Sequence, residues 1–555
     1  MTGSSARVQT GGYDLPVYDY VRPPELAGGP RRRYPVVIVG GGLSGLTAAC
    51  DLACRGIEAV LLDEDDTIGV RGASSRGICY AQKSLEIFDR LGIYQRIRDK
   101  GITWSVGKVV EGEEVLYSFD LAPGSASAQP PFINIQQFYV EWFLVDRIRE
   151  LGRTDLRWKN RVTAVRQGAE HAVLSVETPD GAYEIEADWV VDATGLASPI
   201  RDGLGLPTHP ERGEDRWCIS DVRFRKPLPT ERWTWVEAPF NENRAVWQHL
   251  MADGVWRIDY QMAPNADPAE VSRTEVAEAR LRAHLGPEVE FEVVWVGPYS
   301  YRTHLMDDFR CGRVLFIGDA AHVMSPFGAR GGNSGIQDAD NLGWKLALVL
   351  RGEAPESLLD SFDAERRPAA AHNIKVTSRT GRFLAPRTEM ERIIRKAVLD
   401  LSTEHPFARL LLNTGRMSAP FRYDASPLNT GAEGEAVPNV RLGEGVLSDL
   451  LRGEGAAFVA LWAPDPAQPG LAAALQAVAE RGWPVRVFAC GAEAQPLPHL
   501  SGSGMGLLGL TPGTLLLVRP DQHLAARIRD ADPAALEAAL ARALCRAPSD
   551  ALARA

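Results

Sequence analysis

The pattern of apolar and polar positions in the first part of the chain predicts alternating strands and helices. The β-branched run at 34–40 is typical of a buried parallel strand. A helical pattern follows over 46–55, a glycine ends it, and a second apolar run covers 58–63. Strand, helix and strand in this order predict a βαβ unit. Strand-like runs at 189–192 and 312–318 extend the α/β scheme, and a long helical pattern follows the second of them.

Residues 216–295 show a different periodicity, because apolar and polar positions alternate there. The segments 232–237 and 255–261 carry this alternation, which predicts half-buried strands of a largely antiparallel sheet. Helical patterns then continue to about residue 420. The last hundred residues form a second, smaller α/β pattern after a stretch rich in Gly, Pro, Ser and Asn.

These patterns divide the chain into six parts. We expect an α/β domain that is interrupted by an antiparallel sheet and followed by a small α/β unit. The expected boundaries are 1–33 for an irregular N-terminal arm, 34–215 and 296–375 for the large α/β domain, 216–295 for the inserted sheet, 376–423 for a helical segment, 424–438 for a linker and 439–547 for the C-terminal unit.

Composition narrows the choice of partners. The chain has 555 residues and a net charge of −11, so it lacks the basic footprint of a nucleic-acid-binding protein. The seven cysteines contain no C-x-x-C pair and no close metal-ligand partners, so we expect neither a disulfide framework nor a metal centre. The sequence shows no signal-peptide pattern and no 18-residue apolar run, which favours a cytoplasmic protein without membrane contact. The expected partners are small molecules, with a homodimer as an option.

The glycine-rich turn after the first strand has the spacing of a dinucleotide-binding site. The spacing G-x-G-x-x-G is matched by GGGLSG at 40–45, and Asp63 ends the next strand 18 residues later. Gly40 permits the tight turn, Gly42 lets the backbone approach a pyrophosphate, and Gly45 allows close helix–strand contact. The helix N-terminus offers unpaired N–H groups to the phosphates, and Asp63 would accept hydrogen bonds from the adenosine ribose.

A second and longer pattern lies where the chain returns to the α/β scheme. It reads GRVLFIGDAAH at 312–322, PFGARGGNSG at 326–335 and DADNL at 338–342. A carboxylate directly after a buried strand, here Asp319, can hold the hydroxyl groups of a sugar chain. A glycine-rich loop lets backbone N–H groups reach a flat ring. The helix that is expected to start near Asn333 would direct its positive end at charge that develops on that ring.

The two patterns together resemble the FAD-dependent aromatic hydroxylases, the class A flavoprotein monooxygenases such as p-hydroxybenzoate, phenol and 3-(3-hydroxyphenyl)propionate hydroxylases. The resemblance is close over about 34–375. It implies a Rossmann-like FAD-binding domain with an inserted, mainly antiparallel substrate-binding sheet. It also implies that the C-terminal unit is a thioredoxin-like domain, here without C-x-x-C and therefore without dithiol chemistry. The implied cofactors are non-covalent FAD and, as reductant, NADH or NADPH.

Other segments of the family pattern are matched elsewhere. The stretch SRGI puts Arg76 where the family has an arginine against the FAD. Gln137 starts a Gln-x-x-x-Glu helix and would contact the adenosine end, and SFDAERRP at 361–368 resembles a structural segment of the family. The chain departs from the pattern at one position: aligned on Ser198, Thr194 stands where the family usually has an Asp tied to FAD and nicotinamide.

The resemblance implies an NAD(P)H-dependent monooxygenase. Such an enzyme would use O2 to hydroxylate an aromatic, phenolic substrate through a flavin C4a-hydroperoxide, while the protein positions the substrate and excludes water. One alternative on the same scaffold is an epoxidase or Baeyer–Villiger oxygenase of a polyketide or other secondary metabolite. A non-enzymatic alternative is an FAD-binding scaffold.

Two sets of site residues follow. The expected cofactor-binding residues are Gly40, Gly42, Leu43, Ser44, Gly45, Asp63, Glu64, Arg76, Gln137, Asp319, Pro326, Gly331, Gly332 and Asn333. A flat apolar wall would suit an aromatic substrate, and the residues expected to form it are Trp235, Trp247, His249, Trp256 and Tyr260, with Trp217 and Trp233 as further candidates. No residue is assigned as the catalytic base, and His322 is expected only to pack beside its strand.

Overall fold

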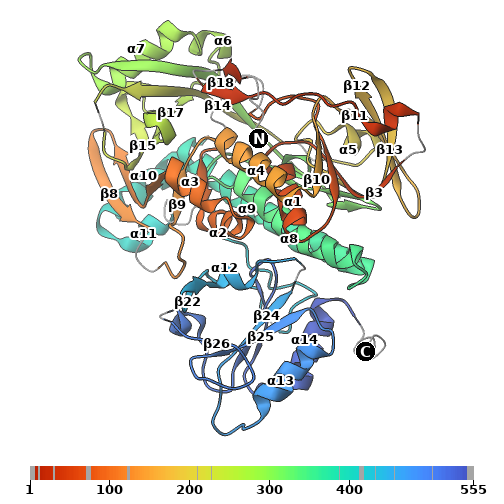
Figure 1. Cartoon of the computed structure of the whole chain (residues 1–555). Coiled ribbons are helices and arrows are strands. Elements are labelled where there is room, and N and C mark those ends of the chain that lie inside the picture. The colour runs from red at the N-terminus through yellow and green to blue at the C-terminus, as the bar shows by residue number, and fades with distance from the viewer. Residues whose placement is uncertain are drawn as a thin grey trace.

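The structure of the chain is a computed structural model, in which two sheet regions lie above a layer of helices and a C-terminal unit (Figure 1). It describes residues 7–10, 13–28, 32–69, 77–121, 125–208, 211–226, 228–386, 388–411, 418–431, 433–454, 457–502 and 504–546. Among the helices in these ranges, none is both long and apolar enough to cross a membrane.

The first sheet is parallel over most of its width. Its strands are β3 (Arg33–Val39), β4 (Ala59–Leu62), β10 (Thr154–Arg157), β11 (Arg161–Gln167), β12 (Ala172–Thr178), β13 (Gly181–Asp192), β19 (Arg310–Cys311) and β20 (Val314–Phe316). The order is β10-β4-β3-β13-β12-β11, and β20 pairs in parallel with β13. Strands β10, β4, β3 and β13 are mutually parallel, whereas β11, β12 and β13 form an antiparallel meander. Helix α1 (Leu43–Cys54) joins β3 to β4, which confirms the predicted βαβ unit.

The second sheet is the antiparallel one. Its strands are β7 (Val106–Glu111), β8 (Glu114–Asp120), β14 (Glu211–Phe224), β15 (Arg232–Ala238), β16 (Arg244–Leu250), β17 (Val255–Met262), β18 (Phe291–Leu305) and β21 (His322–Val323). The order is β21-β18-β14-β17-β16-β15-β7-β8, and only the β15–β7 pair is parallel. The segments 232–237 and 255–261 are strands as predicted.

The boundaries expected for the inserted sheet differ from those observed. Strands β7 and β8 come from 106–120, which the sequence pattern had placed in the large α/β domain. Strand β14 also begins before residue 216, and β18 runs past residue 295. Pairing between β7 and β15 joins segments more than a hundred residues apart, so no local periodicity marks it.

The two faces of this sheet have different neighbours. On the outer face, Leu281 of α7 (Thr274–Leu285) packs with Cys218, Val246 and Tyr260, and the short helix α6 (Pro268–Val271) precedes α7. On the inner face lies a small antiparallel sheet of β5 (Cys79–Ala81), β9 (Phe132–Asn134) and β6 (Ile102–Trp104). A hydrogen bond of 3.0 Å from Nδ2 of Asn134 to the carbonyl of Leu250 joins the two sheets.

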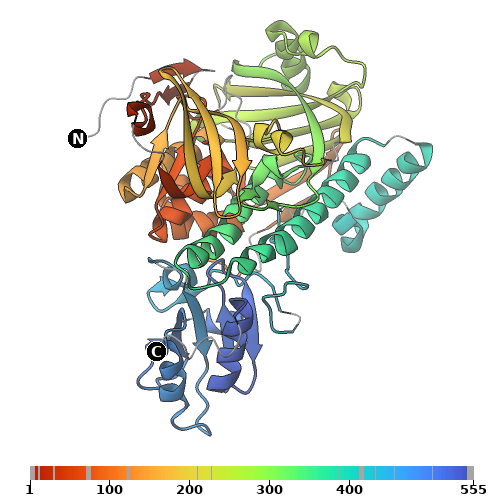
Figure 2. The same cartoon turned by 90° about the vertical axis from the view of Figure 1, so that its right-hand side faces the viewer.

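Helices fill the space beneath both sheets. They are α2 (Gln82–Leu91), α3 (Tyr94–Lys100), α4 (Gln137–Leu151), α5 (Pro199–Gly203), α8 (Gly331–Leu350), α9 (Asp360–Leu384), α10 (Glu389–Glu404) and α11 (Pro406–Leu411). Figure 2 shows α8 and α9 running side by side between the sheets and the C-terminal unit. From Asn333 to Leu348, α8 is buried on all sides.

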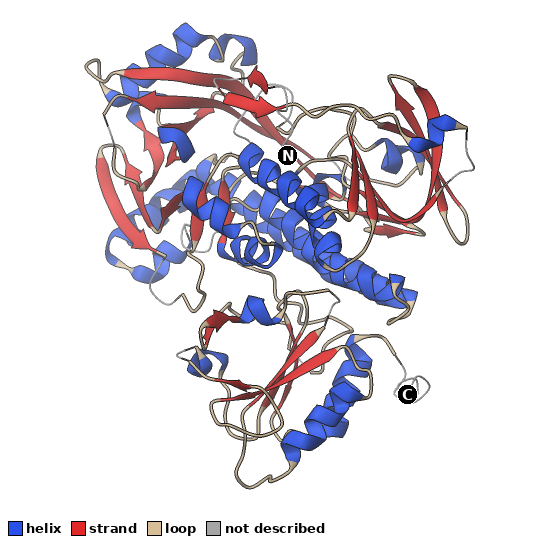
Figure 3. Ribbon diagram, viewed as in Figure 1, coloured by secondary structure: helices blue, strands red, loops and turns tan. Residues whose placement is uncertain are grey.

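The C-terminal unit contains a mixed five-stranded sheet, and Figure 3 shows helices packed beside it. Its elements are β22 (Arg441–Leu442), β23 (Gly445–Val446), α12 (Leu447–Leu450), β24 (Phe458–Trp462), α13 (Leu471–Glu480), β25 (Val485–Cys490), β26 (His499–Leu500), β27 (Leu515–Val518), β28 (Leu524–Ile528) and α14 (Pro533–Ala543). The sheet order is β26-β25-β24-β27-β28. Leu475 and Leu536 of the two long helices pack with Phe458 and with Trp344 of α8, so the core of this unit continues into the large domain.

Two segments that the composition marks as irregular are in fact packed. The predicted N-terminal arm forms a hairpin of β1 (Arg7–Thr10) and β2 (Tyr13–Pro16), and Tyr18 stacks on Trp158 at 4.5 Å. Within the predicted linker, Leu428 and Asn429 are buried. A few buried side chains anchor each segment, although Gly and Pro are frequent in the local composition.

Candidate active site

Of three glycines at the start of α1, Gly40 and Gly45 pack against neighbouring backbone, whereas Gly42 borders free space. A Cβ on Gly40, whose φ is +106°, would lie 2.5 Å from the carbonyl oxygen of Ala193. A Cβ on Gly45 would lie 2.0 Å from the carbonyl oxygen of Gly40. Gly42 is exposed, and a Cβ there would meet no atom within 4 Å. Of the three, only Gly42 leaves free space in which a ligand can approach the backbone.

The N-terminus of α1 is suited to an anion. Its N-cap is Gly42, and no side chain caps the helix. The N–H groups of a first helical turn have no acceptor within the helix, and they carry the positive end of the helix dipole. A phosphate that occupies the free space at Gly42 would satisfy them.

Asp63 lies at the end of β4 beside this turn. Its carboxylate accepts hydrogen bonds from the N–H groups of Gly41 and Asp65, the second at 2.8 Å. Burial raises the pKa of Asp63 to about 6, although these two hydrogen bonds act to lower it. Its neighbour Glu64 is exposed, and Oε2 of Glu64 lies 3.7 Å from Nε of Arg161. Asp63 is therefore the carboxylate of this pair that the fold holds beside the turn.

An open surface cavity of about 430 Å³ lies beyond Glu64. Its lining consists of Glu64, Asp65, Asp66, Lys159, Glu177, Thr178 and Pro179. Four of these seven residues are acidic and one is basic, so the cavity repels phosphate. The pyrophosphate site is better assigned to the α1 turn.

Residues far apart in the sequence converge at the N-terminal ends of α1 and α8. A Cβ added at Gly318 or at Gly335 would lie 2.3 Å from Oγ of Ser44 in α1. A Cβ on Gly332 would lie 3.3 Å from Cδ2 of Leu43. The two glycine patterns of the sequence therefore meet in one place.

Asp319 and the first turn of α8 border the same place. Asp319 is exposed and lies in a short 3-10 helix, η4 (Gly318–Ala320). Helix α8 starts at Gly331, two residues earlier than predicted, and no side chain caps it. Gly332 is exposed, and Gly331 and Pro326 are half-buried. A second uncapped helix N-terminus thus lies next to the first.

Asn333 was predicted as a cofactor ligand, but its side chain bonds to the protein. Its Oδ1 accepts hydrogen bonds from the N–H of Ala81 (3.0 Å) and from Oγ of Ser84 (2.7 Å). Its Nδ2 donates to the carbonyls of Cys79 (2.9 Å) and Ala329 (2.6 Å). The amide is fully used. Asn333 therefore ties α8 to β5 and α2, and only its backbone is left for a ligand.

Gln137, the first residue of α4, also bonds within the protein. Its Oε1 accepts from the N–H of Gly77 (3.1 Å), and its Nε2 donates to Glu141 (2.8 Å). Glu141 in turn accepts from the N–H of Gly69 (2.9 Å). The Gln-x-x-x-Glu pair therefore holds both sides of the segment that contains Arg76. Arg76 lies outside the described residues, so its contact with FAD stays a prediction, as does that of Gln137 with adenosine.

Thr194, at the position of the family Asp, binds a neighbouring carboxylate. Its N–H and Oγ1 donate to Oδ1 of Asp192 at 2.9 and 2.6 Å, and Oγ of Ser198 donates to Oδ2. Burial raises the pKa of Asp192, which these hydrogen bonds counteract. An Asp at 194 would repel this buried carboxylate, so a hydroxyl group suits the position.

An aromatic wall lies between the inner face of the second sheet and the loop before α8. Trp217 of β14 stacks on Trp247 of β16 with ring centroids 4.7 Å apart. Phe327, directly after Pro326, meets the two rings edge-on at 5.9 and 5.0 Å. All three side chains are buried. This Trp217–Trp247–Phe327 wall therefore joins the second sheet to the loop before α8, and it includes a predicted pocket residue, Trp247.

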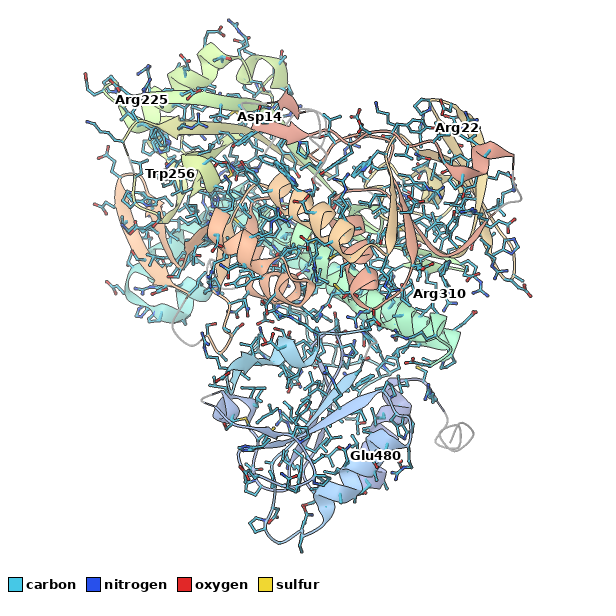
Figure 4. All side chains as sticks on the ribbon, viewed as in Figure 1. Asp14, Arg22, Arg225, Trp256, Arg310 and Glu480 are labelled. Carbon is cyan, nitrogen blue, oxygen red and sulfur yellow. The ribbon has the colours of Figure 1, made fainter. Side chains whose placement is uncertain are left out.

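Three predicted pocket residues are on the wrong face of the sheet. The prediction fails for Trp235, Trp256 and Tyr260, which pack on the outer face. The hydroxyl of Tyr260 lies 3.0 Å from Nδ1 of His284 in α7, and Trp235 meets the His284 ring edge-on at 4.9 Å. Figure 4 marks Trp256 within this sheet. Side chains alternate between faces along a strand, and the sequence does not reveal which alternate set faces the flavin domain.

Buried polar side chains share the inner face with Trp247. His249 pairs across the strands with Arg257, and Asp259 pairs with Trp247. Nε of Arg257 lies 3.0 Å from Oδ1 of Asp259. Burial and then the charges of Arg232 and Arg257 lower the pKa of His249 well below its usual value, so the imidazole is neutral. Sequence reasoning missed Arg257 and Asp259, because the alternation in 255–261 separates two faces of the strand but does not show which of them is the inner one.

The comparisons with known proteins agree with this geometry. The sequence model of the FAD binding domain family matches residues 33–377. The chain is 28% identical over 351 residues to a 3-(3-hydroxy-phenyl)propionate/3-hydroxycinnamic acid hydroxylase of Mycolicibacterium smegmatis, across 63% of this chain and 61% of that protein. It is 29% identical over 515 residues to an anhydrotetracycline monooxygenase of Streptomyces rimosus, across 89% and 95% respectively. The solved structure of the flavin-dependent monooxygenase PieE in complex with FAD and substrate superposes with a TM-score of 0.77 at 21% identity, across 94% of this chain and 100% of PieE.

The chain therefore belongs to the FAD binding domain family. It is a flavin-dependent monooxygenase of the FAD-dependent aromatic hydroxylase class, which confirms the predicted family and fold class. The residues present fit FAD. The open backbone at Gly42 and the uncapped N-terminus of α1 suit its pyrophosphate, and the uncapped N-terminus of α8 suits its ring. The exposed carboxylate of Asp319 suits its ribityl chain.

Proposed function

We propose that the protein uses NADH or NADPH and O2 to hydroxylate an aromatic substrate, either a phenol or the aromatic ring of a polyketide. One oxygen atom enters the substrate, and the other leaves as water with the hydride of the nicotinamide and a proton. FAD, when bound, would supply the redox chemistry of hydride acceptance and O2 activation. The observation that carries the proposal is the meeting of the two glycine patterns beside the aromatic wall.

The residues of the chain bind and orient the cofactor in this proposal. The α1 N-terminus at Gly42 binds the pyrophosphate, Asp63 accepts from the ribose, and Asp319 accepts from the ribityl chain. The first turn of α8 directs its N–H groups at the ring and stabilises the negative charge of the reduced state.

The inner face of the second sheet orients the substrate. The buried Trp217–Trp247–Phe327 wall forms an apolar boundary of the substrate region and keeps water from the reacting atoms. His249, two residues from Trp247 on the same face, brings a neutral imidazole that can donate a hydrogen bond to a substrate oxygen or accept one from it.

Epoxidation or Baeyer–Villiger oxidation of a polyketide is the second candidate. The alignment with the anhydrotetracycline monooxygenase spans 95% of that protein, against 61% of the hydroxycinnamic acid hydroxylase. A 4-methyl-5-nitrocatechol 5-monooxygenase is matched over 98% of its length as well, so coverage supports single-ring and polycyclic aromatic substrates equally.

The test combines flavin analysis with oxygen labelling. Purified protein should release one FAD per chain on denaturation, and a panel of phenols and polyketides should contain a compound that stimulates its oxidation of NADH or NADPH. With 18O2, the product should gain one labelled oxygen, and its regiochemistry separates ring hydroxylation from epoxidation and Baeyer–Villiger insertion. If nicotinamide oxidation stays unstimulated across the panel and no label is incorporated, the FAD-binding scaffold becomes the better interpretation.

A further inference from the structure

A buried carboxylate in the middle of α8 binds one end of the segment 318–335, which is named the flavin loop for its predicted contact with the flavin. Asp338 is fully buried, and its Oδ2 accepts hydrogen bonds from the N–H of Gly318 (3.0 Å) and from Nε2 of His322 (2.6 Å). Its Oδ1 accepts from Nε of Arg366 (2.7 Å). Burial acts to raise the pKa of Asp338, but His322 and Arg366 hold it at about 2, so the group is ionised at working pH. Asp338 thus fixes the backbone directly before Asp319.

Arg366 of α9 connects this carboxylate to the first turns of α8. Its Nη2 donates to the carbonyl oxygen (3.1 Å) and Oγ (3.2 Å) of Ser334, and its Nη1 donates to the hydroxyl of Tyr423 (2.9 Å). Arg366 is fully buried. Arg366 therefore links α9 to both ends of the flavin loop: to Gly318 through Asp338, and to Ser334 directly.

The preceding residue of α9 binds the C-terminal unit. Oε1 and Oε2 of Glu365 accept from Nη1 (2.5 Å) and Nη2 (2.8 Å) of Arg519, which lies just after β27. Arg519 also donates to both oxygens of Asp521. Lys345 of α8 donates to Glu365 at 2.7 Å. Two positive and two negative side chains are thus buried together where the C-terminal unit meets α8 and α9.

The buried ionic contact restricts how the C-terminal unit can move relative to the large domain. Interfaces between domains of one chain are commonly polar and allow relative motion. Here, removing one partner would leave an unpaired charge in the interior, which is strongly destabilising, so the contact enforces a single position of the unit. The backbone oxygen of Asp521 also accepts a hydrogen bond of 2.9 Å from Nζ of Lys83 in α2, so a third helix contacts the C-terminal unit.

We propose that the C-terminal unit is a positioning element of the cofactor site, with Arg519 as its key residue. Arg519 fixes Glu365, and the adjacent Arg366 carries that position to Asp338 and Ser334, and so to the flavin loop. Arg519 touches neither cofactor nor substrate in this scheme. The inference rests on the assignment of 318–335 to the flavin, and it gives a function to a unit that lacks C-x-x-C.

The test uses two variants at this buried ionic interface. R519M/D521N removes one charge of each sign, which keeps the interior neutral. R519K keeps the charge but loses the forked grip on Glu365. We expect R519M/D521N to raise the dissociation constant of FAD by about tenfold, within the range of mutations that act through a packed network. The reduction potential and absorption spectrum of the FAD that remains bound should also shift, and R519K should show a smaller change in the same direction.

The matched control is an exposed ion pair that also joins the two parts. Nη2 of Arg153 lies 2.8 Å from Oε1 of Glu454, and the two side chains are 39% and 75% exposed. E454Q should leave the dissociation constant of FAD and its potential unchanged. Wild-type FAD affinity and potential in R519K and R519M/D521N would overturn the proposal, as would an equal effect of E454Q. A wild-type protein that binds FAD but hydroxylates no substrate would contradict the proposed function and leave this inference standing.

Discussion

Gly42→Ala and Gly45→Ala form a pair that separates ligand binding from folding. A methyl group at Gly42 enters free space, and φ there is −81°, which any residue adopts. We therefore expect the unfolding free energy of the apoprotein to change by less than about 1 kcal/mol. The same methyl group occupies the place of the pyrophosphate. Loss of two hydrogen bonds to a charged phosphate, at about 1.5–3 kcal/mol each, should weaken FAD binding more than about 100-fold.

Gly45→Ala should have the opposite profile. Its methyl group would lie 2.0 Å from the carbonyl oxygen of Gly40, about 1 Å inside the closest contact that side chains make. Relief requires the β3–α1 turn to move, at a cost of about 1–3 kcal/mol or more. Urea unfolding of the apoproteins and FAD titration by fluorescence quenching measure both quantities. Wild-type FAD affinity in Gly42→Ala, or an apoprotein destabilised as much as Gly45→Ala, would refute the reasoning.

Three further predictions concern the remaining site residues. FAD affinity should fall as the pH drops through about 6, because the Asp63 carboxyl of the apoprotein becomes protonated there, whereas bound ribose favours its ionised form. In titrations from pH 5 to 8, Asp63→Asn should bind FAD more weakly and should not show this pH dependence. Asp319→Ala should lose about 1.5–3 kcal/mol of FAD binding per hydrogen bond removed, and unchanged affinity would show that the carboxylate is misassigned. Trp247→Phe should raise KM for the aromatic substrate severalfold, whereas Tyr260→Phe, on the outer face, should leave KM unchanged and cost about 1 kcal/mol in urea unfolding.

Local patterns predicted the parts of the site that depend on local backbone geometry. The GGGLSG turn, the position of Asp63 after β4 and the glycine loop before α8 follow from spacing, because each needs small residues within one strand–helix connection. Their convergence also follows, since the carboxyl ends of neighbouring parallel strands lie at the same edge of a sheet. The confirmed βαβ unit belongs to the same class of inference.

The rest of the site depends on contacts between distant segments. Whether Trp247 or Tyr260 faces the flavin domain is decided by the register of β16 and β17 and by α7 covering the other face, and neither leaves a mark in a single strand. Asn333 has the right place for a ligand, yet its amide bonds to residues about 250 positions away. Arg519 looks like an ordinary surface arginine in sequence and is fully buried against α9.

Gly331→Val tests the role of the α8 N-terminus, and the structure changes the reason why it should work. A glycine-type backbone was expected here, but Gly331 is the first residue of a regular helix and its φ is not positive. A Cβ would meet only Cγ of Met324 at 3.9 Å, so valine fits without backbone strain. Its side chain would instead stand between the first N–H groups and the flavin ring, and hold the ring away from them.

The expected consequence is an electron-transfer defect in a normally folded, FAD-loaded enzyme. Weaker stabilisation of the reduced ring by about 1–3 kcal/mol lowers the two-electron potential by about 20–60 mV. Reduction by NADH or NADPH should slow by up to about a hundredfold in stopped-flow measurements, and Gly331→Ala, with its smaller side chain, should slow it less. The pyrophosphate end is untouched, so FAD content should stay near one per chain. Wild-type potential and reduction rate in FAD-loaded Gly331→Val would mean that the first turn of α8 only packs and that the charge of the reduced ring is stabilised elsewhere.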